Sequence, residues 1–127
     1  MNRRMQQSLA DRIHQQARRI DFLFRWGGDE FALLLPCTSV GDAAELGERI
    51  RISLSSAPFL VAPGGIRVTA SIGVAGTTAF PASTEALLHQ ADAACYRAKE
   101  NGRDRVVIAE EILPSRMSRS KRLLRSA

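Results

Sequence analysis

Two apolar runs joined by a short acidic turn constrain the fold of this chain more than any other feature of its sequence. The runs, residues 22–26 and 31–35, are rich in aromatic and long aliphatic side chains, and residues 27–30 (GGDE) lie between them. Two such runs joined by a Gly-Gly turn are typical of a β-hairpin, in which glycine supplies the positive φ of a tight turn. Pro36 ends the second strand, so we expect an antiparallel pair here.

Hydrophobic periodicity places further helices and strands around this hairpin. Ser39, with Asp42 three residues later, has the spacing of a helix N-terminus. Ser83 begins a second helical pattern, and Gly102 marks its C-terminal end. This alternation of helices and strands is typical of an α/β fold with helices covering a sheet. The predicted order is a helix over 5–19, the hairpin, a helix over 39–55, a strand over 66–74, a helix over 83–102 and a strand over 105–108.

The net charge of +5 is concentrated at the C-terminus. Residues 115–127 contain five basic residues and no acid. The length of 127 residues favours one domain, so we expect a folded domain over residues 1–110 and a basic, disordered tail over residues 111–127. Such a tail is suited to RNA, anionic lipid or an acidic partner, but a solvated terminus is the commoner case, and we expect no specific nucleic-acid partner.

The sequence offers no sign of a membrane or a disulfide. Its longest apolar run, residues 31–35, is far shorter than the roughly 20 residues of a membrane span, and no apolar signal-peptide core follows the N-terminal arginines. Cys37 and Cys95 are far apart and are not spaced with the histidines as metal ligands. We therefore expect a cytoplasmic protein without a transmembrane segment, and both cysteines in its core.

The two carboxylates of the turn are unusual for a hairpin. Asp29 and Glu30 supply hard oxygen ligands of the kind that Mg²⁺ prefers, and Mg²⁺ usually shares such ligands with substrate phosphates. The neighbouring glycines let a phosphate or a ribose approach the backbone. Nucleotide chemistry and a merely solvated acidic turn are equally compatible with these residues alone.

Three segments of the chain together resemble one protein family. Residues 25–31 (RWGGDEF) resemble the signature of the GGDEF domain of diguanylate cyclases. Residues 71–74 (SIGV) resemble a later strand of that family, and residues 91–104 (ADAACYRAKENGRD) resemble its final helix and exit. The resemblance covers about residues 5–109 and implies a nucleotidyl-cyclase-like α/β sheet with flanking helices.

The resemblance also implies an activity and a set of site residues. GGDEF domains join two GTP molecules into cyclic di-GMP with release of pyrophosphate, and two domains face each other as a homodimer. Carried over to this chain, Gly27 and Gly28 pack against the nucleotide, while Asp29 binds Mg²⁺ or Mn²⁺ and assists deprotonation of the attacking hydroxyl. Glu30 is the acidic neighbour of Asp29 in catalysis and metal binding. The basic pair on the last helix, Lys99 and Arg103, matches the residues that contact the triphosphate, and a spacing of four residues places both on one helix face.

A second site is implied just upstream of the turn. Arg18 and Asp21 form an R-x-x-D pattern at the distance from the signature where the family binds its inhibitory product, cyclic di-GMP. Arg49 on the next helix matches a further product-binding arginine. Guanine offers acceptors that suit arginine and donors that suit a carboxylate. The alternative is an ion pair between Arg18 and Asp21 at a helix end.

The sequence departs from the family at its start. A full domain opens with a central strand that carries a metal-binding aspartate, followed by helices whose Asn and Asp recognise guanine, and residues 1–9 match neither. We therefore expect a domain truncated at its N-terminus, without the opening strand and first helix and with a gap in the sheet. Two hypotheses remain: a diguanylate cyclase domain that is incomplete and inactive alone, or a noncatalytic module that binds cyclic di-GMP through Arg18, Asp21 and Arg49.

Overall fold

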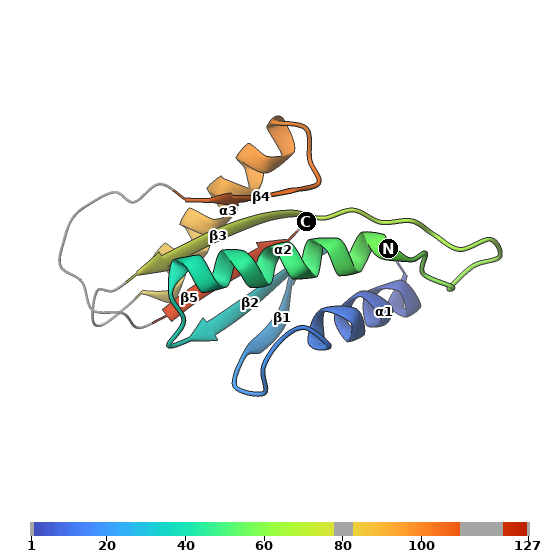
Figure 1. The fold of residues 1–127 in the computed structure, drawn as a ribbon, viewed down its shortest axis with the longest axis horizontal. Coiled ribbons are helices and arrows are strands. Elements are labelled where there is room, and N and C mark those ends of the chain that lie inside the picture. The colour runs from blue at the N-terminus through green and yellow to red at the C-terminus, as the bar shows by residue number, and fades with distance from the viewer. Residues whose placement is uncertain (1, 78–82, 110–120, 127) are drawn as a thin grey trace.

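Three helices and five strands make up the described part of the chain in a computed structural model (Figure 1). The structure describes residues 2–77, 83–109 and 121–126. The helices are α1 (Arg3–His14), α2 (Val40–Ser56) and α3 (Thr84–Glu100), and the strands are β1 (Phe22–Gly27), β2 (Glu30–Pro36), β3 (Ser71–Thr77), β4 (Arg105–Ile108) and β5 (Lys121–Ser126). The α/β fold class is confirmed.

One sheet with strand order β1-β2-β5-β3-β4 lies between two helical layers. Among the described strands, β3 and β4 pair in parallel and the other neighbours are antiparallel. Side chains alternate across the sheet: Leu33 and Ile72 pack in one cluster with the apolar faces of α1 and α2, whereas Ala32 and Ala75 pack with α3. The first two helices therefore cover one face, and α3 covers the other.

Each helix begins at a polar side chain that accepts a backbone N–H. Asn2 Oδ1 accepts from Met5 N at 2.8 Å, Ser39 Oγ from Asp42 N at 3.1 Å, and Ser83 Oγ from Ala86 N at 3.1 Å. Such caps satisfy N–H groups that the first turn leaves without partners. The two helix starts predicted at Ser39 and Ser83 are confirmed.

The strongest difference from the sequence analysis lies in the C-terminal segment. Residues 111–127 were expected to be a disordered tail, but residues 121–126 form β5 and pair with β2 on one side and β3 on the other. The expectation is therefore wrong for this segment, while residues 111–120 and 127 lie outside the described residues. The predicted gap in the sheet is also wrong, because β5 joins the β1–β2 hairpin to the β3–β4 pair.

Three local expectations also need correction. The first helix ends at His14 rather than residue 19, because i→i+3 bonds tighten its last turn and Asp21 then accepts the Arg18 N–H. The strand expected over 66–74 begins only at Ser71, since Ile66 pairs back with Phe59 in an isolated bridge. Cys95 is buried as expected, but Cys37 is exposed.

The helix on the second face packs directly on strand backbone. A Cβ atom built on Gly73 would lie 2.1 Å from the Ala91 carbonyl oxygen and 2.4 Å from Cys95 N. Only glycine allows β3 and α3 to approach this closely. This contact fixes α3 against β3. Within the described ranges, no helix combines the length and the apolar composition that a bilayer crossing requires.

Candidate functional site

The hairpin turn is open on its outer side. The pair Gly27 and Glu30 closes the ladder between β1 and β2, with a bulge between Arg25 and Gly27. Contrary to expectation, neither Gly27 nor Gly28 has a positive φ. A Cβ atom on Gly28 would meet no described atom within 4 Å, and one on Gly27 would lie 4.0 Å from Glu30 Oε1. Neither backbone conformation nor crowding by described residues requires glycine here, so the open surface is free for a ligand to approach.

The two carboxylates of the turn differ in exposure. Asp29 is exposed, whereas Glu30 is half-buried with its carboxylate beside Gly27. Among the described residues, no three acidic, histidine or cysteine side chains come together as a metal site. Mg²⁺ is commonly held by one or two carboxylates that share it with substrate phosphates. The donor set of Asp29 and Glu30 therefore fits a divalent cation that arrives with a phosphorylated ligand.

A cavity with both polar and apolar lining residues, which the sequence analysis missed, adjoins the hairpin. It has a volume of about 350 Å³ between α1 and the hairpin, and its lining includes Arg3, Gln6, His14 and Arg25. Arg25 connects the cavity to the turn, because its Nη1 donates to Gln6 Oε1 at 3.0 Å and its Nε to Gly27 O at 3.3 Å. Basic and amide side chains from two elements meet here, a juxtaposition that sequence spacing does not reveal.

The basic pair Lys99 and Arg103 does not lie on one helix face. Helix α3 ends at Glu100, and Gly102 has a φ of 116°. Arg103 N then donates to Ala98 O at 2.8 Å and Gly102 N to Lys99 O at 3.5 Å, which is the bonding pattern of a Schellman motif. The expectation of a helical i, i+4 stripe is wrong for Arg103, because the glycine reverses the chain before that residue.

Strand register places the turn and the Arg103 loop at the same end of the sheet. Phe31 of β2 pairs with Ser126, Ser126 pairs with Ile72, and Ile72 pairs with Val106 of β4. The residues just before Phe31 and Val106 therefore lie on one edge of the sheet, three strand spacings or about 14 Å apart. The acidic residues Asp29 and Glu30 lie at the β2 side of this edge, and the basic residue Arg103 lies at the β4 side.

The Arg18–Asp21 pair is a close ion pair in the structure. The Asp21 carboxylate has no exposed side-chain surface, whereas 48% of the Arg18 side chain is exposed. Arg18 Nη2 donates to Asp21 Oδ1 at 2.7 Å and to Thr38 Oγ1 at 2.6 Å, and Arg18 N donates to Asp21 Oδ2 at 2.8 Å. The side-chain hydrogen bond with Asp21 raises the pKa of Arg18 above its usual value. The ion pair that the sequence analysis kept as an alternative is present.

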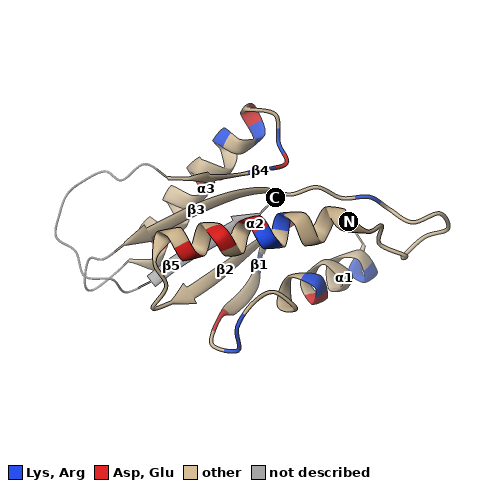
Figure 2. Cartoon of the chain, in the orientation of Figure 1, with Lys and Arg blue, Asp and Glu red and all other residues tan. Residues whose placement is uncertain are grey.

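Arg18 and Arg49 line one cavity of about 260 Å³, which lies between the segment after α1, the end of β2 and α2. Asp42 and Glu45 of α2 also line it, so its wall carries both charges, and acidic and basic residues follow each other along α2 in Figure 2. Asp21 is not among the lining residues. The structure thus brings two of the three predicted product-binding residues to one cavity and places the third behind Arg18.

The chain is similar to many proteins of one family. The family model described as "Diguanylate cyclase, GGDEF domain" matches residues 4–105. The response regulator PleD of Caulobacter vibrioides is 44% identical over 98 residues, which are 76% of this chain and 22% of PleD. The diguanylate cyclase DgcM of Escherichia coli K12 is 43% identical over 102 residues, or 80% of this chain and 24% of DgcM. The chain thus spans about a quarter of the length of these curated relatives.

Solved structures agree with the sequence matches. The GGDEF domain of DgcB from Caulobacter crescentus, in complex with c-di-GMP, superposes with a TM-score of 0.75 at 31% identity, covering 85% of this chain and 64% of that one. The active GGEEF domain of a diguanylate cyclase from Vibrio cholerae gives a TM-score of 0.74 at 27% identity, covering 85% and 68%.

Proposed function

The chain belongs to the GGDEF-domain family of diguanylate cyclases, and on that premise we propose that the hairpin turn and the loop after α3 form its GTP site. In this proposal the chain contributes to a cyclase that condenses two GTP molecules into cyclic di-GMP and releases pyrophosphate. The site uses Gly27, Gly28, Asp29 and Glu30 from the turn. Lys99 and Arg103 provide the basic side.

The observation that carries the proposal is the unexplained glycine at the turn. Gly28 has no positive φ, and no described atom lies within 4 Å of a Cβ built on it, so packing among the described residues does not require glycine there. A ligand that packs against the bare backbone would explain it. The adjacent carboxylates and the basic loop on the same edge of the sheet match the charges of a metal-bound triphosphate.

Each residue has a defined part in the proposed reaction. The 3′-oxygen of one GTP bonds to the α-phosphorus of a second GTP, and the bond from that phosphorus to the β-phosphate oxygen breaks. Asp29 takes the proton of the attacking hydroxyl, and Lys99 and Arg103 hold the departing pyrophosphate. Mg²⁺ or Mn²⁺ held by Asp29 and Glu30 would neutralise charge on the triphosphate. A second identical event closes the ring, so two copies of the domain must face each other.

The 127-residue chain alone is expected to make little cyclic di-GMP. The family resemblance implies a further metal-binding aspartate and an Asn and Asp for guanine, and this sequence contains no match for them. Incubation with GTP and Mg²⁺, followed by chromatography of the products, tests this expectation. Turnover that disappears in Asp29→Ala would contradict the expected inactivity and would still support the assignment of Asp29.

Binding of GTP tests the site itself. Gly28→Ala is expected to weaken GTP affinity by about tenfold or more in titration calorimetry with Mg²⁺, because the new methyl group occupies the ligand's position. Its melting temperature should stay unchanged, since the methyl group meets no described atom. Gly41→Ala is the matched control, because a Cβ there also meets nothing closer than 4.0 Å. Equal GTP affinity in Gly28→Ala and wild type would remove the turn from the nucleotide site.

A second function, binding of cyclic di-GMP, is favoured by the cavity that Arg18 and Arg49 share. Because the Asp21 carboxylate is buried against Arg18, we assign Arg18 and Arg49 to direct contact with the ligand and Asp21 to the orientation of Arg18. This function does not require a complete catalytic site. It therefore applies whether or not the chain is part of an active enzyme.

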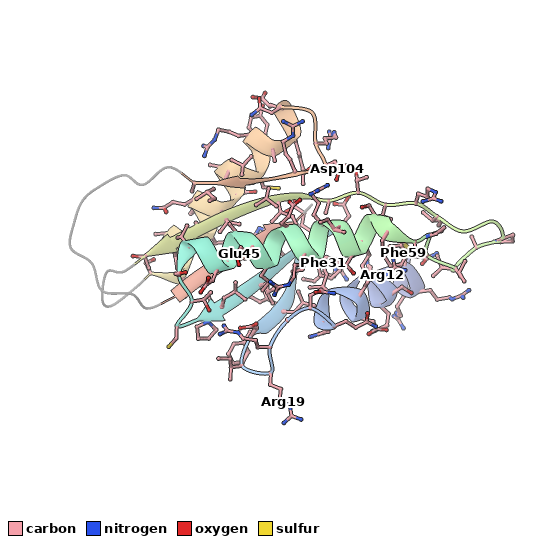
Figure 3. All side chains as sticks on the ribbon, viewed as in Figure 1. Arg12, Arg19, Phe31, Glu45, Phe59 and Asp104 are labelled. Carbon is pink, nitrogen blue, oxygen red and sulfur yellow. The ribbon has the colours of Figure 1, made fainter. Side chains whose placement is uncertain are left out.

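Titration with cyclic di-GMP separates these roles. Arg18→Ala and Arg49→Ala should each weaken binding by about tenfold, as expected for loss of one charged hydrogen-bonding partner. Arg19→Ala is the control, since Arg19 points away from the body of the molecule (Figure 3). If Arg18→Ala binds cyclic di-GMP as tightly as wild type, this cavity is not the product site.

A further inference from the structure

The loop after α3 contains three consecutive residues with left-handed backbone conformation. The φ angles are 116° at Gly102, 63° at Arg103 and 48° at Asp104. Glycine adopts such angles without penalty, but Arg103 and Asp104 carry a Cβ that makes them unfavourable. Backbone strain of this kind persists only where surrounding contacts hold it, and it often occurs at functional sites.

Hydrogen bonds fix both backbone groups of Arg103. Its N–H donates to Ala98 O at 2.8 Å, and its carbonyl oxygen accepts from Arg105 Nε at 3.0 Å. By contrast, the Arg103 guanidinium is exposed and makes no hydrogen bond or ion pair with another described residue. The loop therefore orders the Arg103 backbone and leaves its charged group open to a ligand.

Arg51 of α2 holds the third left-handed residue. Arg51 Nη1 donates to Asp104 Oδ1 at 2.8 Å, across 53 positions of sequence. Only 21% of the Arg51 side chain is exposed, and its Nε also donates to Glu48 Oε1 at 3.0 Å. These two carboxylates raise the pKa of Arg51 above its usual value, with Glu48 the larger cause, and the Arg51 guanidinium lowers the pKa of Glu48. Glu48 thus orients Arg51 toward Asp104.

The ion pair connects two layers of the fold. Arg51 lies on α2, which covers one face of the sheet, and Asp104 follows α3, which covers the other. Asp104, labelled in Figure 3, directly precedes the edge strand β4. The backbone that carries Arg103 is therefore fixed from both faces of the sheet.

We propose that Arg51 is a positioning residue for the GTP site: through its ion pair with Asp104 it holds the left-handed loop that presents the Arg103 guanidinium to the triphosphate. The inference rests on the proposed GTP site. A cation whose backbone is ordered before binding loses less conformational freedom when the triphosphate arrives. Arg51 itself does not touch the nucleotide.

GTP affinity in a double-mutant cycle tests the functional part of the inference. Arg51→Ala and Asp104→Asn should each weaken GTP binding about fivefold to tenfold in calorimetry, as for loss of preorganisation of one side chain. Adding Arg51→Ala to Arg103→Ala should cause no further loss of GTP affinity, because the guanidinium that Arg51 positions is already absent. The charge swap Arg51→Asp with Asp104→Arg should recover part of the affinity. Arg67→Ala, which removes one exposed positive charge on the loop before β3, is the control.

Amide exchange at Arg103 tests the structural part without any ligand. Exchange of its N–H should be faster in Arg51→Ala and Asp104→Asn than in wild type, and equal exchange would overturn the inference. The inference would also be overturned if the losses of GTP-binding free energy in Arg51→Ala and Arg103→Ala were fully additive, since Arg51 would then act independently of Arg103. Wild-type protein that binds no GTP would contradict the proposed function. Binding that depends on Arg103 but not on Arg51 would contradict only the present inference.

Discussion

The Arg12 guanidinium lies 3.6 Å from the centroid of the Phe59 ring and joins α1 to the segment that follows α2 (Figure 3). The same group donates to Ala57 O at 2.7 Å and to Ser53 O and Leu54 O at 3.4 Å. These carbonyls belong to the C-terminal end of α2, where a positive charge is favourable. Arg12 therefore donates hydrogen bonds to the carbonyl groups at the end of α2 and also covers the face of the buried Phe59 ring.

Arg12→Ala should lower the free energy of unfolding by about 1–3 kcal/mol, because it removes a cation–π contact and charged hydrogen bonds to the end of α2. Urea denaturation followed by circular dichroism measures the change. Arg19→Ala is the control and should leave stability unchanged, since Arg19 is exposed and points outward. Equal stability of the two variants would mean that the Arg12 contacts contribute nothing.

Gly73→Ala should lower the stability of the fold more than Gly28→Ala or Gly41→Ala. The new Cβ would overlap the Ala91 carbonyl oxygen and Cys95 N, and backbone cannot move aside as a side-chain end does. We expect a loss of about 3 kcal/mol or more in the free energy of unfolding. Gly41→Ala, in the exposed first turn of α2, should keep or raise stability by about 0.5 kcal/mol. A wild-type melting temperature in Gly73→Ala would disprove this close packing of α3 on β3.

The two cysteines should differ sharply in reactivity. Burial raises the pKa of the Cys95 thiol, which also donates to Ser71 O at 3.3 Å, whereas Cys37 is exposed. At pH 8 a thiol reagent should modify Cys37 quickly and Cys95 only when the protein unfolds. Peptide mapping identifies which cysteine carries the label. Rapid labelling of Cys95 in folded protein would show that α3 opens readily.

The Cys95 thiol also gives stability a pH dependence. In the unfolded chain it ionises above about pH 8.5, while the raised pKa keeps it protonated in the folded protein. Ionisation therefore favours the unfolded state, and the contribution of Cys95 to stability is present below pH 8.5 and falls as pH rises, by at most about 1.4 kcal/mol per pH unit. The stability difference between wild type and Cys95→Ala should shrink between pH 7.5 and pH 10. A constant difference would argue against the raised pKa.

A proline in β5 tests whether the C-terminal segment completes the sheet. Leu124 pairs with Leu33 of β2 and Val74 of β3, and proline in a central strand removes a ladder hydrogen bond. Leu124→Pro should lower the free energy of unfolding by at least about 3 kcal/mol, whereas Leu124→Val retains the N–H and should be far milder. If Leu124→Pro has the same free energy of unfolding as wild type, residues 121–126 do not belong to the sheet.

Local chemistry explains which parts of the fold could be predicted from the sequence. The capped helix starts and the hairpin follow from residues within a few positions of one another, and these predictions are confirmed. The position of β5 could not be predicted, because the edges of β2 and β3 select it from far away in the sequence and its own pattern is that of a basic tail. Non-local pairing of this kind leaves no local periodicity.

The same distinction applies to the candidate site. The turn over residues 27–30 was identified from its glycines and carboxylates, although the reason given for glycine, a positive φ, is wrong. The position of Arg103 was predicted wrongly, because the helix face was extended past Gly102, the residue predicted to end the helix, and a residue after a C-terminal glycine leaves that face. The Arg51–Asp104 pair joins residues 53 positions apart, and neither residue is distinguished by its sequence neighbours.

The central place of β5 has a consequence for biosynthesis. The hairpin and the β3–α3–β4 unit are synthesised first, yet they share no sheet until residues 121–126 arrive between them. At translation rates of about 5–20 residues per second, roughly one to four seconds separate synthesis of Ile108 from that of Ser126. Until β5 pairs, β2 and β3 each present an unpaired strand edge, which is prone to pair with other chains. Newly made molecules of this protein should therefore depend on chaperone protection most strongly until β5 has paired with β2 and β3.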